Sequence, residues 1–150
     1  MTILGDGPGD YLHYLRQRVT MLGIENLVDF MAPVQREQMP EILSKHDVLI
    51  MPSEYGEPIA RSMQEGMAMG LLVIGTTTGG SGELLQHERN GLVFPAADAQ
   101  SLATQIARAG NTPELGDRLA RQGQEDVRTN FDIRLTVDRI EDYLAGRCPR

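Results

Sequence analysis

The feature that most constrains the fold is the short segment Asp47–Met51 (DVLIM), which is almost entirely apolar. Parallel strands that helices cover on both faces have this composition, because neither face meets water. Similar short runs occur at Thr2–Leu4, Leu27–Phe30, Leu71–Ile74 and Leu92–Phe94. The sequence therefore predicts several buried strands of a parallel sheet.

Between these runs lie segments in which apolar residues recur at helical spacing. They predict helices over Asp10–Leu22, Gln35–Lys45 and Pro58–Met69, one or two helical turns at Glu83–Gln86, a helix from its cap at Asp98 to about Ala109 with Leu102 and Ile106 inward, and two helices over 113–144 that break near Asn130. Strand and helix alternate, so the predicted fold class is α/β, a Rossmann-like parallel sheet flanked by helices.

Size and charge limit the class of protein. The 150 residues suffice for one domain, and a net charge of −7 argues against a nucleic-acid binder. The single cysteine, Cys148, favours a reducing, cytoplasmic setting, and no apolar run is long enough to span a membrane, although other parts of a longer protein could be peripheral to one. Because Thr2–Leu4 follows the first methionine directly, we expect residues 1–150 to form a single, N-terminally incomplete domain.

Three loops are expected to carry the ligand site. In open parallel sheets, ligands bind outside the carboxyl ends of the strands. The loop GDGPG at Gly5–Gly9, the segment Ser53–Arg61 and the loop Gly75–Gly82 each follow a predicted strand. We therefore expect all three to meet at one edge of the sheet.

The second of these loops contains Glu57, which forms a pair with Glu65 farther along the segment EPIARSMQE. On one helix they would lie about 12 Å apart on roughly the same side, which suits two distant parts of one elongated ligand. Pro58 is favoured at a first helical position, and the amides that follow it, with Arg61, could hold a phosphate. The alternative is that Glu57 only caps the helix and Glu65 faces solvent.

The other two loops give weaker signals. Gly5 and Gly7 lack the full GxGxxG spacing, so a plain turn is as good an interpretation as a ligand loop. Gly79 and Gly80 could present bare amides to a ligand or belong to a flexible loop. The chain has no Asp-x-Asp pair and only scattered histidines, so we expect no metal and no cofactor.

These motifs resemble the retaining glycosyltransferases of family 4, the "group 1" type, in their C-terminal, nucleotide-sugar-binding domain. EPIARSMQE matches the family's E-x7-E motif, usually EPFGxxxxE, and EGMAMGLLVIGTTTGG resembles its EAMAxGxPVIxxxxGG. GGSGELLQHERNGLVFPAADAQSLA follows its GGxxExxxxxxNGxLxxxxD pattern, and GDGPGDYLHYLRQRVTMLGIENLVDF its GxGPxxxxL segment. The resemblance extends to about Ile106.

The resemblance implies a GT-B fold, of which this chain would be most of the second domain. It places Glu57 near the donor sugar and its leaving diphosphate, as the catalytic residue, and Glu65 on the ribose hydroxyls. It places Pro58, Ile59, Ala60 and Arg61 beside the sugar, with Gly79 and Gly80 lining the same pocket. It implies hexosyl transfer from a nucleoside-diphosphate-sugar, without a metal, to an unknown glycan, lipid or small molecule.

The sequence also departs from the family's pattern. Ile59-Ala60 stands where Phe-Gly is usual, and Ala32 where a glycine is usual. The family's first strand and helix, with the Arg and Lys that neutralise the diphosphate, and its acceptor-binding N-terminal domain have no counterpart in the sequence. We therefore expect this chain alone to be inactive, with exposed apolar surface that drives self-association.

Other functions fit parts of the same pattern. A sugar-nucleotide epimerase uses the same two-domain plan and would be favoured by catalytic carboxylates and histidines in the missing half. A non-catalytic binding or scaffold domain would keep the fold, and unchanged transfer after replacement of Glu57 in the full-length protein would favour it. A nicotinamide-binding module is disfavoured because GxGxxG is lacking.

Overall fold

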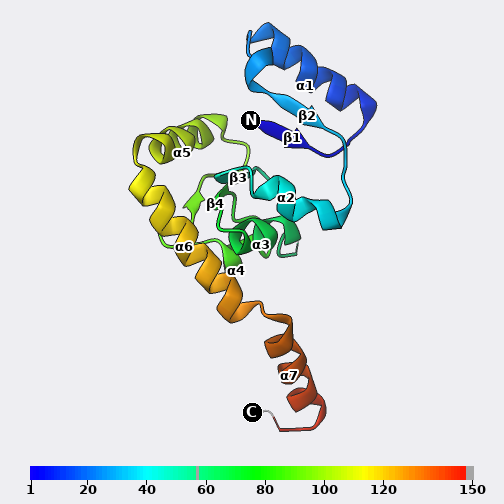
Figure 1. Ribbon diagram of the computed structural model, residues 1–150, viewed down its shortest axis with the longest axis vertical. Coiled ribbons are helices and arrows are strands. Elements are labelled where there is room, and N and C mark those ends of the chain that lie inside the picture. Colours follow the sequence, from blue (N-terminus) through cyan, green and yellow to red (C-terminus); the bar gives the residue numbers. More distant parts are fainter. Residues whose placement is uncertain (57, 148–150) are drawn as a thin grey trace. The chain divides into compact units, whose positions relative to one another are not determined.

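The computed structural model describes residues 1–56 and 58–147 and divides the chain into two compact units, Met1–Met39 and Pro40–Arg150 (Figure 1). In the first unit, strand β1 (Thr2–Leu4) pairs in parallel with β2 (Asp29–Met31), so that Ile3 lies opposite Phe30. Helix α1 (Gly9–Met21) and the 3-10 turn η1 (Glu25–Leu27) connect them, and a second 3-10 turn, η2 (Arg36–Gln38), follows. The guanidinium of Arg16 lies 4.7 Å from the centre of the Phe30 ring, which holds α1 on this strand pair.

The second unit contains a three-stranded parallel sheet in the order β3-β4-β5. Its elements are α2 (Met39–Leu43, beginning at the boundary), β3 (Val48–Met51), α3 (Arg61–Ala68), β4 (Leu72–Gly75), α4 (Ser81–Leu84), β5 (Leu92–Val93), α5 (Ala99–Asn111), α6 (Pro113–Asn130) and α7 (Ile133–Leu144). Every strand pair in the described chain is parallel, which confirms the predicted fold class.

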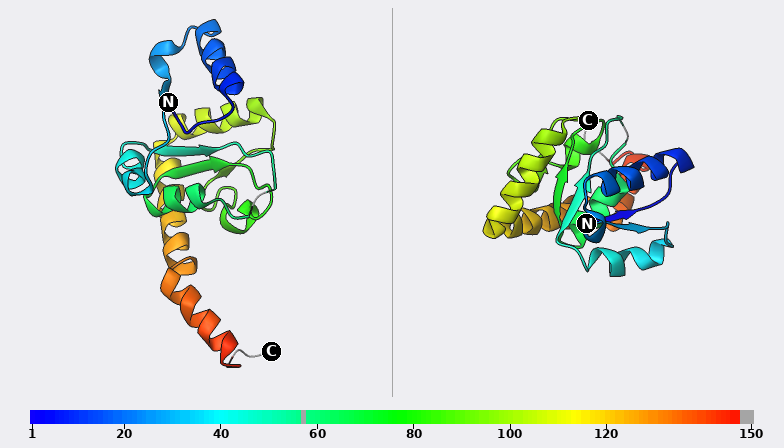
Figure 2. Two further views of the ribbon diagram at one scale, coloured as in Figure 1. Left: turned by 90° about the vertical axis from the view of Figure 1, so that its right-hand side faces the viewer. Right: turned by 90° about the horizontal axis from the view of Figure 1, so that it is seen from above.

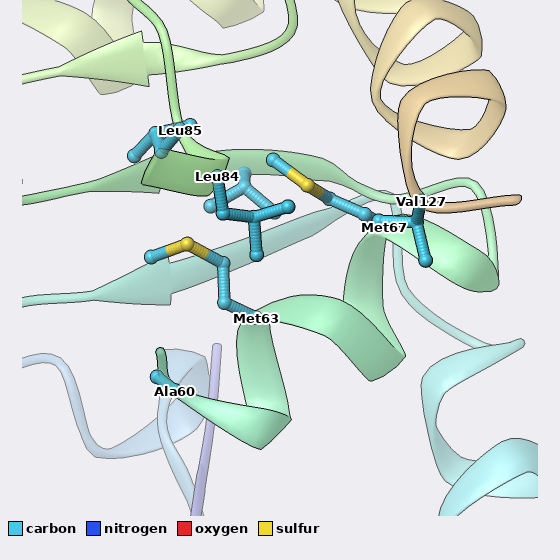
Figure 3. Packing of buried hydrophobic residues seen from close by; sticks show 7 residues of the cluster. Ala60, Met63, Met67, Leu84, Leu85 and Val127 are labelled. Atoms are coloured by element: carbon cyan, nitrogen blue, oxygen red, sulfur yellow. The ribbon is translucent and has the colours of Figure 1, made fainter. Parts of the chain in front are cut away.

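Strand β4 is the centre of the second unit, and every residue in it is buried. Neighbouring residues of a strand point to opposite faces. Val73 packs on one face in a cluster with Met63 and Met67 of α3, Leu84, Leu85 and Val127 of α6. Figure 3 shows the two methionines reaching toward Leu84, with Val127 beside Met67. Leu72 and Ile74 pack on the other face in a cluster with Leu92, Phe94 and Leu119, against which Leu102 of α5 also packs.

The two faces of the sheet are therefore covered by different helices. Helix α3 lies on the Val73 face and α5 on the face of Leu72 and Ile74 (Figure 2). Helix α6 contributes to both faces. Its residue Leu119 packs in the cluster of Leu72 and Ile74, and its residue Val127 packs in the cluster of Val73.

A buried polar network fixes α6 to the turn before β5. Asp126 accepts two hydrogen bonds from the Arg89 guanidinium, at 2.6 and 2.9 Å, one from Asn90 Nδ2 at 2.7 Å and one from Gln122 Nε2 at 2.9 Å. Asn90 is only 1% exposed and also donates to the carbonyl of Leu84. Burial raises the pKa of Asp126, but the hydrogen bonds from Asn90, Gln122 and Arg89 outweigh it, so that the net pKa lies below its usual value.

Most predicted elements are confirmed with shifted ends. Asp98 caps α5, because its carboxylate accepts the amide hydrogen of Ser101 at 2.9 Å, and Gly70, at φ +81°, ends α3. The helical turns predicted at Glu83–Gln86 begin earlier, as α4. Ile106 was predicted to face inward and is 43% exposed, so that prediction is wrong. Among the described residues, no helix is both long and apolar enough to cross a membrane.

We predict that Asp126→Asn destabilises the protein by about 1–3 kcal/mol near neutral pH, because charged hydrogen bonds are lost. A carboxyl whose folded pKa is lowered stabilises the fold above its unfolded pKa, about 3.9, and loses this contribution as pH falls through the folded value. The difference between wild type and variant in urea unfolding should therefore shrink below about pH 4. A difference that stays constant down to acid pH would contradict this role.

We also predict that Gly91→Ala destabilises the fold by about 1–3 kcal/mol, because the added methyl has no room. A Cβ there would lie 2.7 Å from the backbone oxygen of Val73, which the β4 ladder holds in place. The control is Gly110→Ala in α5, where a Cβ would meet nothing within 4 Å. That change should stabilise the protein by up to about 1 kcal/mol in thermal or urea unfolding.

Candidate functional site

The loops after β3 and β4 touch each other at the carboxyl edge of the sheet. A Cβ built on Gly80 would lie 2.9 Å from the backbone nitrogen of Ile59 and 3.3 Å from the carbonyl carbon of Pro58. A Cβ on Gly56 would lie 3.8 Å from the Cα of Gly79. The structure therefore brings the predicted pair Gly79-Gly80 directly against the predicted segment that begins at Pro58.

Helix α3 begins later than predicted. Its first residue is Arg61, so the prediction that Pro58 occupies the first helical position is wrong. Ala60 is extended, with φ −66° and ψ 119°, and only 5% exposed within the cluster around Met63. Burial of Ala60 and the contact of Ile59 with Gly80 hold this stretch in a non-helical form, so the helix begins later. The 12 Å estimate, which assumed one helix from Glu57, therefore does not apply.

The start of α3 is suited to an anion. Ala60 is the N-cap residue and has no side-chain oxygen with which to accept a hydrogen bond. The amides of Met63 and Gln64 donate to the carbonyl of Ala60, whereas Arg61 and Ser62 occupy the first helical positions before them. Amides at such positions carry a positive partial charge. Arg61 is exposed at this helix start, and its contact with a ligand stays a prediction.

Glu65 lies in the second turn of α3 and is half-buried, so it is not on the fully exposed face of the helix. Its neighbour Gly66 lets α3 approach β3 closely, because a Cβ there would lie 2.5 Å from a methyl carbon of Leu49. The other predicted carboxylate, Glu57, lies outside the described residues.

Hydroxyl groups connect the two loops nearer the strands. Thr76, directly after β4, is 2% exposed, and its Oγ1 donates to the backbone oxygen of Ser53 at 2.7 Å. Thr78 Oγ1 donates to the same oxygen at 3.3 Å. Sequence reasoning missed these threonines, because the loop was interpreted through its glycines. The signal was three β-branched hydroxyl residues directly after a buried strand.

An open hollow of about 520 Å³ adjoins this edge, where β4 and β5 end. It is lined by the three threonines Thr76, Thr77 and Thr78, by His87, and by residues Val93 to Ala96. His87 Nδ1 accepts the amide hydrogen of Val93 at 2.9 Å, so the proton of a neutral ring lies on Nε2.

The first glycine loop belongs to the other unit. Gly5 has φ +131°, which suits glycine, and its amide donates to the carbonyl of Met31 at 3.1 Å. Gly7 has open space where a Cβ would be. Convergence is thus confirmed for two of the three loops, while a role of Gly5 and Gly7 at the same site stays a prediction. Among the described residues, no group of three or more His, Cys, Asp or Glu could hold a metal ion.

The profile of the family described as "Glycosyl transferases group 1" matches residues 1–126. The chain belongs to this family. Its similarity to solved structures agrees: HepE of Anabaena, crystallised with UDP, has a TM-score of 0.90 and 28% identity over 97% of this chain and 40% of that one. Sucrose-phosphate synthase of Thermosynechococcus elongatus has a TM-score of 0.84 and 26% identity, over 98% of this chain and 39% of that one. The α/β fold is therefore that of GT-B glycosyltransferase C-terminal domains.

Curated relatives give the same picture. Mannosylfructose-phosphate synthase of Agrobacterium fabrum is 30% identical over 136 residues, which is 91% of this chain and 30% of that protein. N-acetyl-alpha-D-glucosaminyl L-malate synthase of Bacillus anthracis is 29% identical over 94% of this chain and 36% of its own length. The chain thus spans about a third of the length of these relatives.

Proposed function

We propose that this chain is the donor-binding part of a glycosyltransferase that moves a hexosyl group from a nucleoside-diphosphate-sugar to an acceptor, with retention and without a metal. The proposal rests on the contact between Gly80 and Ile59, just before the start of α3. A Cβ built on Gly80 would lie 2.9 Å from the backbone nitrogen of Ile59. This contact joins two donor-binding motifs of the family at the sheet edge where such ligands bind.

The site offers a separate group for each part of the donor. The amides of Arg61 and Ser62, the dipole of α3 and the Arg61 guanidinium would stabilise the negative charge that develops on the leaving diphosphate. Glu65, one turn further along α3, would accept hydrogen bonds from the ribose hydroxyls. Glu57 is assigned to the reacting sugar through the family resemblance, either as nucleophile or as a stabiliser of a cationic sugar.

Uridine nucleotides are the first donors to test. HepE has been crystallised with UDP, with UDP-glucose, and with UDP and glucose. The acceptor, the transfer step and the catalytic role of Glu57 are proposals for a whole protein of the relatives' length, because this chain spans only about a third of it.

We predict that titration of the chain with UDP-, GDP- and ADP-sugars will shift the amide resonances of Gly80 and Arg61 for one nucleotide class. Glu65→Gln should weaken that binding about tenfold, because a charged hydrogen-bond acceptor becomes neutral. Gly80→Ala should weaken it at least as much, because a backbone nitrogen occupies the space of the new methyl.

The matched control is Asp117→Asn, which neutralises an exposed carboxylate of α6. It should bind like wild type. If binding is saturable and neither Glu65→Gln nor Gly80→Ala changes its affinity, the donor binds elsewhere. If no sugar nucleotide binds, the result counts against the proposed function.

We also propose that the chain self-associates through α7. Ile133, Val137, Ile140 and Leu144 are 72%, 43%, 54% and 77% exposed and follow the spacing of a coiled-coil seam. In an antiparallel pair, Ile133 would lie opposite Leu144 of the second copy. Arg134 would then lie near Glu141 of that copy, so the charges beside the seam are complementary.

We predict that Ile140→Glu abolishes concentration-dependent association in sedimentation velocity, because it places a charge in the seam. Leu135→Glu is the control, since Leu135 is 41% exposed but lies off the seam. It should associate like wild type. Monomeric wild type at every concentration would contradict the pairing.

A further inference from the structure

Two loops of the candidate site share one hydrogen-bond acceptor. The backbone oxygen of Ser53, two residues beyond β3, receives the Thr76 hydroxyl at 2.7 Å and the Thr78 hydroxyl at 3.3 Å. The two hydroxyl oxygens are themselves 3.3 Å apart. Thr76 makes the shorter bond and is almost fully buried, at 2% exposure.

The backbone of Thr76 is fixed by the neighbouring strand. Its amide donates to the carbonyl of Met51 at 3.1 Å, which extends the β3–β4 pairing by one step. A β-branched side chain on such a backbone has few rotamers available. The hydroxyl of Thr76 is therefore held at a fixed place relative to the end of β3.

The same two loops meet again farther from the strands. There the backbone of Gly80 lies against Ile59, directly before the start of α3. The Thr76 hydroxyl thus holds residues 53–56 through the Ser53 carbonyl, and the backbone of Gly80 lies against residues 58 and 59. Loss of the hydrogen bond to Ser53 should therefore loosen the contact between Ile59 and Gly80, because only a few residues separate Ser53 from Ile59.

We propose that Thr76 is a positioning residue, whose hydroxyl sets residues 53–56 and 58–60 against Gly79-Gly80. The role rests on the proposed function, since these are the segments assigned to the donor. Thr76 itself does not touch the donor in this proposal. It acts through the Ser53 carbonyl.

Hydrogen exchange tests the attachment without any ligand. The amide of Ser81 donates to the carbonyl of Thr78 and that of Met63 to the carbonyl of Ala60, so each loop has its own reporter. Thr76→Val keeps the side-chain shape and removes the hydroxyl. Both amides should exchange at least about tenfold faster, while those of Val73 and Ile74 in β4 change little.

Two further variants separate the hydroxyl from packing. Thr76→Ser keeps the hydroxyl and should restore slow exchange, and Thr77→Val removes an exposed neighbouring hydroxyl and should change nothing. Equal exchange in Thr76→Val and wild type would overturn the proposal. So would equal acceleration across β4, which would indicate general destabilisation, or a failure of Thr76→Ser to restore protection.

Titration with UDP-glucose then tests the consequence for the donor. If wild type binds, Thr76→Val should bind about tenfold more weakly and Thr76→Ser about as well as wild type. Unchanged affinity in Thr76→Val would overturn the positioning role. If neither UDP-glucose nor another sugar nucleotide binds wild type, the donor proposal fails, while the exchange result still decides whether Thr76 holds the two loops together.

Discussion

Burial of β4 on both faces is the constraint on which the second unit depends. Its four residues are all buried, and their alternating side chains enter two separate clusters. Apolar area of this kind is the main favourable term in folding. Because both clusters must form together, α3, α5 and α6 are fixed relative to one strand, and with them the positions at which β3 and β4 end.

The candidate site follows from this arrangement. A parallel strand delivers its next residues to the carboxyl edge, so the residues after β3 and β4 start side by side. The hydroxyl of Thr76 and the bare Cα of Gly80 then keep the two loops together beyond the strands. Helix α3 approaches the sheet closely at Gly66, which determines where Arg61 and Glu65 lie relative to these loops.

Elements with a strong local signal could be predicted from sequence, and those set by tertiary contacts could not. The apolar runs of β3 and β4, the cap at Asp98 and the glycine after α3 are local signals, and the structure confirms them. The start of α3 is decided by the burial of Ala60 in the core and by the contact of Ile59 with Gly80, which is distant in sequence. The local preference of Pro58 for a first helical position therefore predicted the wrong start of the helix. The hydrogen bonds of Asp126 with Arg89 and Asn90 join residues that are far apart in the sequence, and no sequence pattern predicts them. Ile106 matches a helical period, yet too little of the protein lies over it to bury it.

Two positions of the site with small residues, Ala60 and Gly80, are under different constraints. Ala60 stands where the family usually has glycine, but its φ of −66° is available to any L-residue, so the backbone does not require glycine there. Gly80 is different, because a methyl group would lie 2.9 Å from the Ile59 nitrogen. The departure at Ala60 therefore leaves the path of the backbone intact and changes only the side-chain surface next to the site. Ile59 also packs against the cluster that contains Ala60, so both residues that depart from Phe-Gly contribute apolar side chains beneath the loop. The residues that shape the contact between the loops, Gly79-Gly80, belong to the family's second motif, which this sequence retains.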